Sequence, residues 1–300
     1  MPQAKANGIT LEYDVHGPAS GEPVLLIMGL GAQMIRWPVP FLELLAAQGL
    51  RVIRFDNRDV GLSEKIEAGG VPDLAKVIGA LMQGQKPDVP YLLDDMAADA
   101  VGLLDALGIG RAHIVGASLG GMVAQLVAAD YPDRVLSLTS IMSTTGNREL
   151  PPAKPEAMAV LNDRGPDPLV DLDGYLTHSL KGSRVIGSPG YPQSEESLRE
   201  SSLASFKRSY YPVGFARQYA AAAASPDRRP KLAGVTAPTV VIHGGDDALV
   251  PVEGGRDTAA SIKGSELRIV PGMGHDFPPE LHGEIAEGIL RAVERSKASA

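Results

Sequence analysis

The fold of this 300-residue chain is decided by residues 112–121, which read Ala112-His113-Ile114-Val115-Gly116-Ala117-Ser118-Leu119-Gly120-Gly121. An apolar run typical of a buried strand leads into Gly-x-Ser-x-Gly, and a helix-like stretch follows. Small residues on both sides let the strand and the helix approach closely, while the turn holds the serine in a strained conformation at the top of a sheet. The pattern resembles a nucleophile elbow. Because it also arises by chance, its meaning depends on the rest of the chain.

Short apolar runs bounded by turn residues recur along the chain, and helix-like stretches lie between most of them. The predicted strands are Ile9–Val15, Val24–Met28, Val52–Phe55, His113–Val115, Leu136–Met142, Thr239–Ile242 and Leu267–Val270. The predicted helices include Tyr91–Leu107, Leu119–Ala129 and Leu281–Val293. This alternation predicts an α/β fold with a mostly parallel central sheet and helices on both faces.

The alternation breaks between about residues 145 and 230, where strand signals vanish and an alanine-rich stretch appears. Pro151-Pro152 opens this segment, and residues 226–230 close it with two further prolines. We interpret residues 145–230 as a helical cap inserted into a core formed by residues 1–144 and 231–300. The alternative is a long surface excursion that has no role in binding.

Composition limits the partners and the chemistry. The net charge is −8 and the pI is near 5.3, which argues against binding to nucleic acid or to an anionic membrane. The first residues have no apolar signal region, so we expect a cytoplasmic protein. The chain has no cysteine and no His/Asp/Glu spacing typical of a metal site, so we expect no metal and no cofactor. The oligomeric state is not predicted.

A serine hydroxyl is a poor nucleophile at neutral pH, so it needs a base, and the base needs a third group that fixes its tautomer. Both follow Ser118 along the chain. The strand-like residues 240–243 run into a turn that contains Asp246 and Asp247. Another strand leads through residues 271–274 to His275. The order of the three residue types is therefore Ser, Asp, His.

With these motifs the chain resembles the α/β-hydrolase-fold serine hydrolases over essentially its whole length. The resemblance implies that Ser118 is the nucleophile, Asp247 the acid and His275 the base. It also implies that the backbone N–H groups of Leu30 and Leu119 form the oxyanion hole. Among family members, the chain most resembles the aclacinomycin methylesterase-like hydrolases, on three features: Met28-Gly29, Trp37-Pro38 and the sequence Asp-x-Arg-Asp-x-Gly-x-Ser at residues 56–63.

Several side chains near these motifs have two possible interpretations. The substrate pocket is predicted to include Gly29, Met34, Trp37 and Met122, although Met and Trp are equally common as core residues. We interpret His113 and His243 as structural, hydrogen-bonded residues. We interpret residues 56–63 as a structural loop in which Arg58 pairs locally.

The residues predict a serine hydrolase that cleaves a carboxylic ester of a small molecule through an acyl-enzyme on Ser118. A methylesterase of a polyketide, a carbon–carbon hydrolase or a perhydrolase would use the same three residues. A non-catalytic small-molecule receptor is a more remote alternative. The acyl chain length and the physiological substrate are left open by the sequence.

Overall fold

The computed structural model describes residues 2–163 and 165–298. Met1, Arg164 and residues 299–300, which the sequence-based division assigns to the core and the cap, lie outside the described residues. Eight strands form one sheet in the order β1-β2-β4-β3-β5-β6-β7-β8. They are β1 (Gln3–Ala6), β2 (Ile9–His16), β3 (Glu22–Ile27), β4 (Leu50–Phe55), β5 (Ala112–Ala117), β6 (Val135–Ile141), β7 (Thr239–Gly244) and β8 (Glu266–Val270).

The pairing confirms the mostly parallel sheet. The strands β1 and β2 are antiparallel to their neighbours, and all pairs from β4 to β8 are parallel. Each of the seven predicted strands is present. The edge strand β1 was not predicted, because only Ala6 of its four residues is buried and it therefore lacks an apolar run. Parallel order places the carboxyl ends of β3, β5, β7 and β8 at the same edge of the sheet, where ligands bind in open α/β folds.

Helices cover both faces of the sheet. Leu25 and Ile27 of β3 pack with α3 (Leu93–Ala106) and α4 (Leu119–Asp130), whereas Val24 and Leu26 pack with α1 (Val39–Ala46) and α11 (His282–Ala298). Successive residues of a strand point to opposite faces, so a strand covered on both faces is apolar throughout. The remaining core elements are α9 (Arg229–Leu232), α10 (Glu253–Ser261), η1 (Met34–Arg36), η2 (Glu67–Gly69), η3 (Pro132–Arg134) and η4 (Pro279–Leu281).

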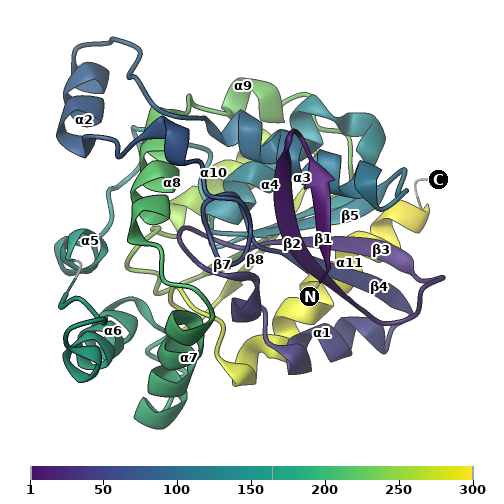
Figure 1. Cartoon of the computed structure of the whole chain (residues 1–300). Helices are drawn as coiled ribbons and strands as arrows, with labels where there is room; N and C mark the ends of the chain where they lie inside the picture. The colour runs from purple at the N-terminus through teal and green to yellow at the C-terminus, as the bar shows by residue number, and fades with distance from the viewer. Residues whose placement is uncertain (1, 164, 299–300) are drawn as a thin grey trace.

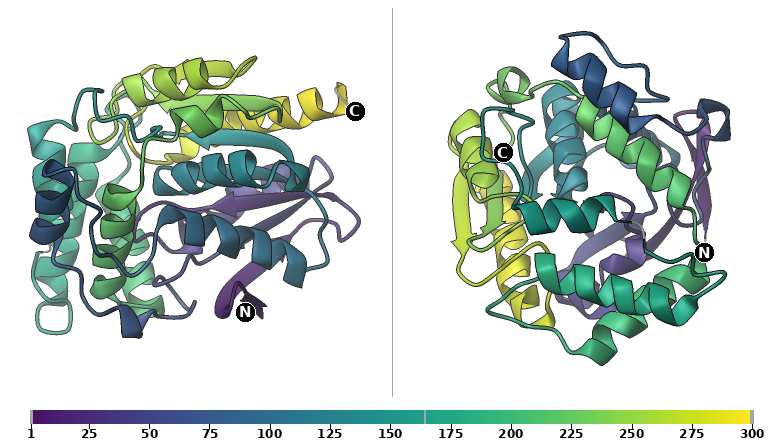
Figure 2. Two further views of the ribbon diagram at one scale, coloured as in Figure 1. Left: turned by 90° about the horizontal axis from the view of Figure 1, so that it is seen from above. Right: turned by 90° about the vertical axis from the view of Figure 1, so that its left-hand side faces the viewer.

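The inserted segment is helical. It contains α5 (Pro155–Asn162), α6 (Leu172–Ile186), α7 (Glu195–Arg208) and α8 (Pro212–Ala224), which Figures 1 and 2 show gathered at one end of the sheet. The helix α2 (Leu74–Met82) contacts α8 and lies beside it in Figure 1, although residues 74–82 belong to the predicted core segment. A bilayer span needs about 20 consecutive apolar residues, and within residues 2–163 and 165–298 no helix meets that requirement.

Candidate active site

The strand-to-helix turn after β5 holds Ser118 in a backbone conformation that residues other than glycine rarely adopt, with φ of 55° and ψ of −121°. The turn is possible because its neighbours are glycine. A Cβ atom on Gly116 would lie 2.0 Å from the Gly120 carbonyl oxygen, and one on Gly120 would lie 2.1 Å from the Ile27 carbonyl oxygen. The nucleophile-elbow pattern therefore has the backbone strain and the close packing that the motif requires.

The structure brings together Ser118, His275 and Asp247, the three residues that the sequence singled out. His275 Nε2 lies 2.9 Å from Ser118 Oγ, and His275 Nδ1 lies 2.7 Å from Asp247 Oδ2. The other oxygen, Asp247 Oδ1, accepts hydrogen bonds from the backbone N–H groups of Leu249 (2.9 Å) and Val250 (2.8 Å). A proton on Nδ1 satisfies the carboxylate and leaves the Nε2 lone pair facing the serine hydroxyl, so this imidazole can accept the serine proton.

Two other histidines have structural partners, as predicted. His243 Nε2 lies 2.8 Å from the Val250 carbonyl oxygen, and His113 Nδ1 lies 2.8 Å from Ser137 Oγ. Burial lowers the pKa of both His243 and His113. Both imidazoles therefore stay neutral near pH 7, and neither lies within hydrogen-bond distance of Ser118.

The loop after β3 passes directly over the serine. A Cβ atom on Gly29 would lie 3.1 Å from the Ser118 Cβ atom. In the described part of the chain, the N–H groups of Leu30 and Leu119 have no hydrogen-bond acceptor, and Leu119 is the first residue of α4, where helix N–H groups lack intrahelical partners. Both amides are therefore free to donate to a substrate oxygen.

This loop has anchors that the sequence reasoning missed. Asn57 Nδ2 donates to the Met28 carbonyl oxygen at 2.9 Å, and the Gly31 N–H donates to Gln218 Oε1 at 2.8 Å. Gln218 belongs to α8 and is fully buried, and its Nε2 donates to the Arg58 carbonyl oxygen at 2.8 Å. Asn57 could have been found from the motif at residues 56–63, whereas no sequence signal connects Gln218 to residue 31.

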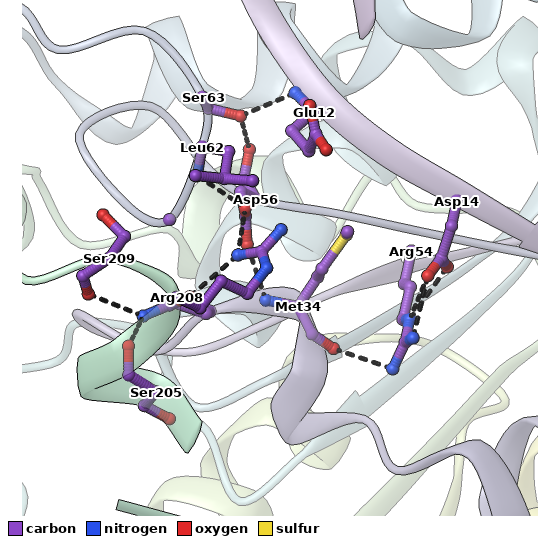
Figure 3. Close-up of polar contacts among 12 residues, drawn as sticks. Glu12, Asp14, Met34, Arg54, Asp56, Leu62, Ser63, Ser205, Arg208 and Ser209 are labelled. Atoms are coloured by element: carbon purple, nitrogen blue, oxygen red, sulfur yellow. Dashed lines mark hydrogen bonds and ion pairs between the residues drawn. The ribbon is translucent and has the colours of Figure 1, made fainter. Parts of the chain in front are cut away.

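A buried carboxylate extends this network to α7 (Figure 3). Asp56 accepts hydrogen bonds from the Met34 N–H at 2.8 Å and the Leu62 N–H at 2.9 Å, and it forms an ion pair with Arg208 at 2.6 Å. The neighbouring Gln33 donates to two carbonyl oxygens at the end of α7, those of Ser205 and Ser209. Helices α7 and α8 are therefore both bonded to the loop that passes over the serine.

Residues 56–63 form the structural loop that the sequence predicts, but the pairing of Arg58 is not local. Its guanidinium binds the Asp99 carboxylate on α3, with N···O distances of 2.6 Å and 2.7 Å. Arg217 of α8 binds Asp59 of the same loop at 2.8 Å. The sequence could not indicate these partners, because they come from helices far away along the chain.

A cavity of about 1440 Å³ lies between the sheet edge and helices α5–α8. Ser118, His275, Gly29 and Met122 line it, and most of its exposed lining is apolar. The prediction that Met34 and Trp37 line the pocket is wrong, because both side chains are fully buried. The η1 turn directs them into the protein interior, where Trp37 packs against two aromatic rings, those of Phe41 and Phe277.

A strained serine at a strand-to-helix turn, bonded to a histidine from a later strand end of a mostly parallel sheet, defines the class of α/β-hydrolase-fold proteins. The family model described as alpha/beta hydrolase fold matches residues 22–280, and the chain belongs to this family. It is accordingly a hydrolase.

Relatives and solved structures agree with this membership. RutD of Variovorax paradoxus, which carries the provisional name carbamate hydrolase, is 32% identical over 268 residues, covering 88% of this chain and 89% of its own. The rhodomycin D methylesterase DauP of Streptomyces sp. strain C5 is 28% identical over 298 residues, covering 94% of each chain. The meta-cleavage product hydrolase CumD of Pseudomonas fluorescens IP01 shares the fold with a TM-score of 0.77 at 20% identity, covering 99% of this chain and 98% of its own.

Proposed function

We propose that this protein is a serine hydrolase that cleaves carboxylic esters of small molecules through an acyl-enzyme on Ser118. The observation that carries the proposal is the hydrogen-bonded series from Ser118 Oγ to His275 Nε2, and from His275 Nδ1 to Asp247 Oδ2, at 2.9 Å and 2.7 Å. Similarity to the methylesterase DauP supports an ester as the substrate, because the alignment covers 94% of both chains.

In the proposed reaction, His275 removes the proton of Ser118 as the serine oxygen attacks the ester carbonyl. The N–H groups of Leu30 and Leu119 hold the oxyanion, and preorganised donors of this kind contribute about 3 to 4 kcal/mol each. His275 then protonates the departing alcohol, which leaves the acyl group on Ser118. Water, activated by the same imidazole, releases the acid, and Asp247 stays ionised throughout.

The size of the cavity bears on the substrate. A volume of about 1440 Å³ exceeds the roughly 300 to 1,000 Å³ of typical ligand pockets. Helices α5–α8 supply much of its lining, and we propose that they form the cap over bound substrate. A large acyl or alcohol group therefore fits the site, which supports a polyketide methyl ester as one candidate. Similarity to RutD makes a carbamate the second candidate, because a carbamate carbonyl can be attacked by the same serine.

The test is turnover of p-nitrophenyl esters from acetate to palmitate by the wild type, Ser118→Ala and Ser137→Ala. Ser137 is a buried serine bonded to His113 and serves as the matched control. We expect Ser118→Ala to lower kcat at least a thousandfold, by analogy with other serine triads, and Ser137→Ala to retain activity. Full turnover by Ser118→Ala would contradict the proposal.

A wild type that hydrolyses none of these esters would be examined with a fluorophosphonate probe. Labelling of Ser118 would indicate a selective hydrolase, for which rhodomycin-type methyl esters and aryl carbamates are the next substrates. Absence of labelling would instead contradict Ser118 as the nucleophile.

A further inference from the structure

The cavity that contains Ser118 also contains a guanidinium group. Arg36 is the last residue of η1, directly after the loop over the serine, and its side chain lines the cavity. Its Nη1 donates a hydrogen bond to Ser201 Oγ on α7. Within residues 2–163 and 165–298, no carboxylate lies within the 4.0 Å of an ion pair with Arg36.

The other arginines around this loop are paired differently. Each has a carboxylate oxygen at 2.6 to 2.8 Å: Arg54 with Asp14, Arg58 with Asp99, Arg208 with Asp56 and Arg217 with Asp59. Arg228, which is also buried, has two uncharged oxygen acceptors, one from Gln125 and one from Thr144. Within the described residues, Arg36 has one hydroxyl partner for its five N–H donors, which leaves most of its hydrogen-bonding capacity without a protein acceptor.

Burial is the larger influence on Arg36 and lowers its pKa, while the nearby Asp276 carboxylate opposes that shift. A guanidinium starts from so high a pKa that Arg36 stays cationic near pH 7. The oxygens of Asp276 are occupied by other donors: the Ser188 N–H at 3.0 Å, the Ser188 hydroxyl, and Gln193 Nε2 at 2.9 Å. Asp276 therefore favours the cationic form of Arg36 without occupying its N–H groups. A partly desolvated cation of this kind is costly unless a ligand compensates it.

We propose that Arg36 binds a carboxylate carried by the substrate, so that the preferred esters are anionic at a point remote from the scissile bond. The proposal rests on the proposed esterase function and assigns its substrate class. A planar guanidinium matches a carboxylate with two parallel N–H···O bonds. Because Arg36 and Ser118 line one cavity, a single molecule can present its ester to Ser118 and its carboxylate to Arg36. Ser201, the hydrogen-bond partner of Arg36, and Ser197, four residues earlier on α7, line the same cavity and carry further hydroxyl groups.

The cavity is also lined by carboxylates, which repel an anion, so a substrate carboxylate has to lie at Arg36 and away from them. These residues are Asp163, Asp167, Glu200 and Asp276. Of these, Asp276 is the one that acts electrostatically on Arg36. The contact with Ser201 also places the guanidinium against α7.

The test compares mono-p-nitrophenyl adipate and suberate with p-nitrophenyl alkanoates of equal chain length. Wild type, Arg36→Met, Arg36→Lys and Arg199→Met are measured. Arg199 lies on α7, but it pairs with Asp173 and does not line the cavity. Arg199→Met therefore shows the effect of losing a positive charge outside the cavity. We expect wild type to prefer the anionic esters. Arg36→Met should lower the ratio of kcat/KM values, anionic over neutral, by about 10- to 100-fold, because charge-assisted hydrogen bonds are lost.

The neutral esters give the internal control. We expect Arg36→Met to change the kcat/KM for neutral esters less than about threefold. Arg36→Lys keeps the charge but not the paired donors, so its ratio of anionic to neutral kcat/KM should lie between those of wild type and Arg36→Met. If Arg36 had a purely structural role, Arg36→Met would lower kcat/KM for anionic and neutral esters alike and leave the ratio of the two values unchanged. An unchanged ratio, or a wild type that discriminates against anionic esters, would overturn the proposal.

A binding measurement separates this proposal from the esterase function. Monomethyl suberate is titrated calorimetrically into Ser118→Ala and into Ser118→Ala/Arg36→Met, where no turnover is needed. We expect the Kd to rise at least tenfold on loss of the guanidinium. Equal Kd values would reject the role of Arg36 even if the enzyme cleaves esters, whereas a tenfold difference would support it even if no p-nitrophenyl ester is cleaved.

Discussion

Gln218 offers a sharp test of how the loop over Ser118 is held. Its Oε1 accepts the Gly31 N–H at 2.8 Å, and its Nε2 donates to the Arg58 carbonyl oxygen at 2.8 Å. The second bond fixes which end of the amide faces Gly31. Because Leu30, the proposed oxyanion donor, directly precedes Gly31, an orientation imposed on Gly31 also limits the direction of the Leu30 N–H.

The change is Gln218→Met, which keeps the volume and removes both polar groups. A buried N–H left without an acceptor costs about 1 to 3 kcal/mol. If that cost appears as loss of transition-state stabilisation, at a factor of ten in rate for each 1.36 kcal/mol, kcat falls about 5- to 150-fold. We expect KM to change little, since the oxyanion contact strengthens in the transition state.

The assay is steady-state hydrolysis of the best p-nitrophenyl ester, with thermal unfolding recorded in parallel. Gln125→Met is the matched control, because Gln125 is equally buried and bonds to Ser140 and Arg228, away from the loop. We expect the control to lose stability but to keep kcat. A folded Gln218→Met variant with wild-type kcat would show that Gln218 does not orient the Leu30 N–H.

Three further outcomes follow from the structure. Asp247→Asn should lower kcat by about 10⁴-fold in the esterase assay, because an amide N–H facing His275 Nδ1 enforces the wrong tautomer; near wild-type kcat would contradict this. Asp56→Asn should cost about 3 to 5 kcal/mol in urea unfolding, because it leaves buried Arg208 uncompensated, whereas Asp173→Asn in an exposed pair should cost less than about 1 kcal/mol. Acidification should also destabilise the protein. Histidines with a lowered folded-state pKa stay neutral in the native protein while the unfolded chain takes up protons below about pH 6.5. The free energy of unfolding is therefore highest above about pH 6.5 and falls below it by up to about 1.4 kcal/mol per pH unit for each histidine. A free energy of unfolding that is constant from pH 7 to pH 5 would contradict this effect, which is expected of His113, His243 and His282.

The sheet and the serine turn were predictable because their signals are local. An apolar run bounded by turn residues indicates a buried strand, and the glycines around Ser118 have no room for a side chain. The strand β1 escaped prediction because an exposed edge strand needs no apolar pattern. The strands that precede them placed Asp246, Asp247 and His275 at one edge of the sheet, since parallel strands end there. The choice of Asp247 over Asp246 came from the resemblance to the α/β-hydrolase-fold serine hydrolases.

The contacts between the inserted helices and the core could not be predicted. Gly31 and its partner Gln218 are 187 residues apart, and Arg208 donates a hydrogen bond to Gln33 Oε1 across 175 residues. Nothing in local periodicity indicates how a helix of the insertion is positioned over a loop of the core. The prediction that Met34 and Trp37 line the pocket failed for a related reason. Closeness to the loop in sequence does not determine which way a side chain points from a tight turn.

The proposed mechanism requires Ser118 to carry the acyl group during turnover. The most direct measurement is mass spectrometry of peptides from enzyme that is acid-quenched while hydrolysing a p-nitrophenyl ester. We expect a mass gain equal to the acyl group on the peptide that contains Ser118, and no such gain in Ser118→Ala. An acyl group on a different residue, or continued turnover by Ser118→Ala without any adduct, would contradict it.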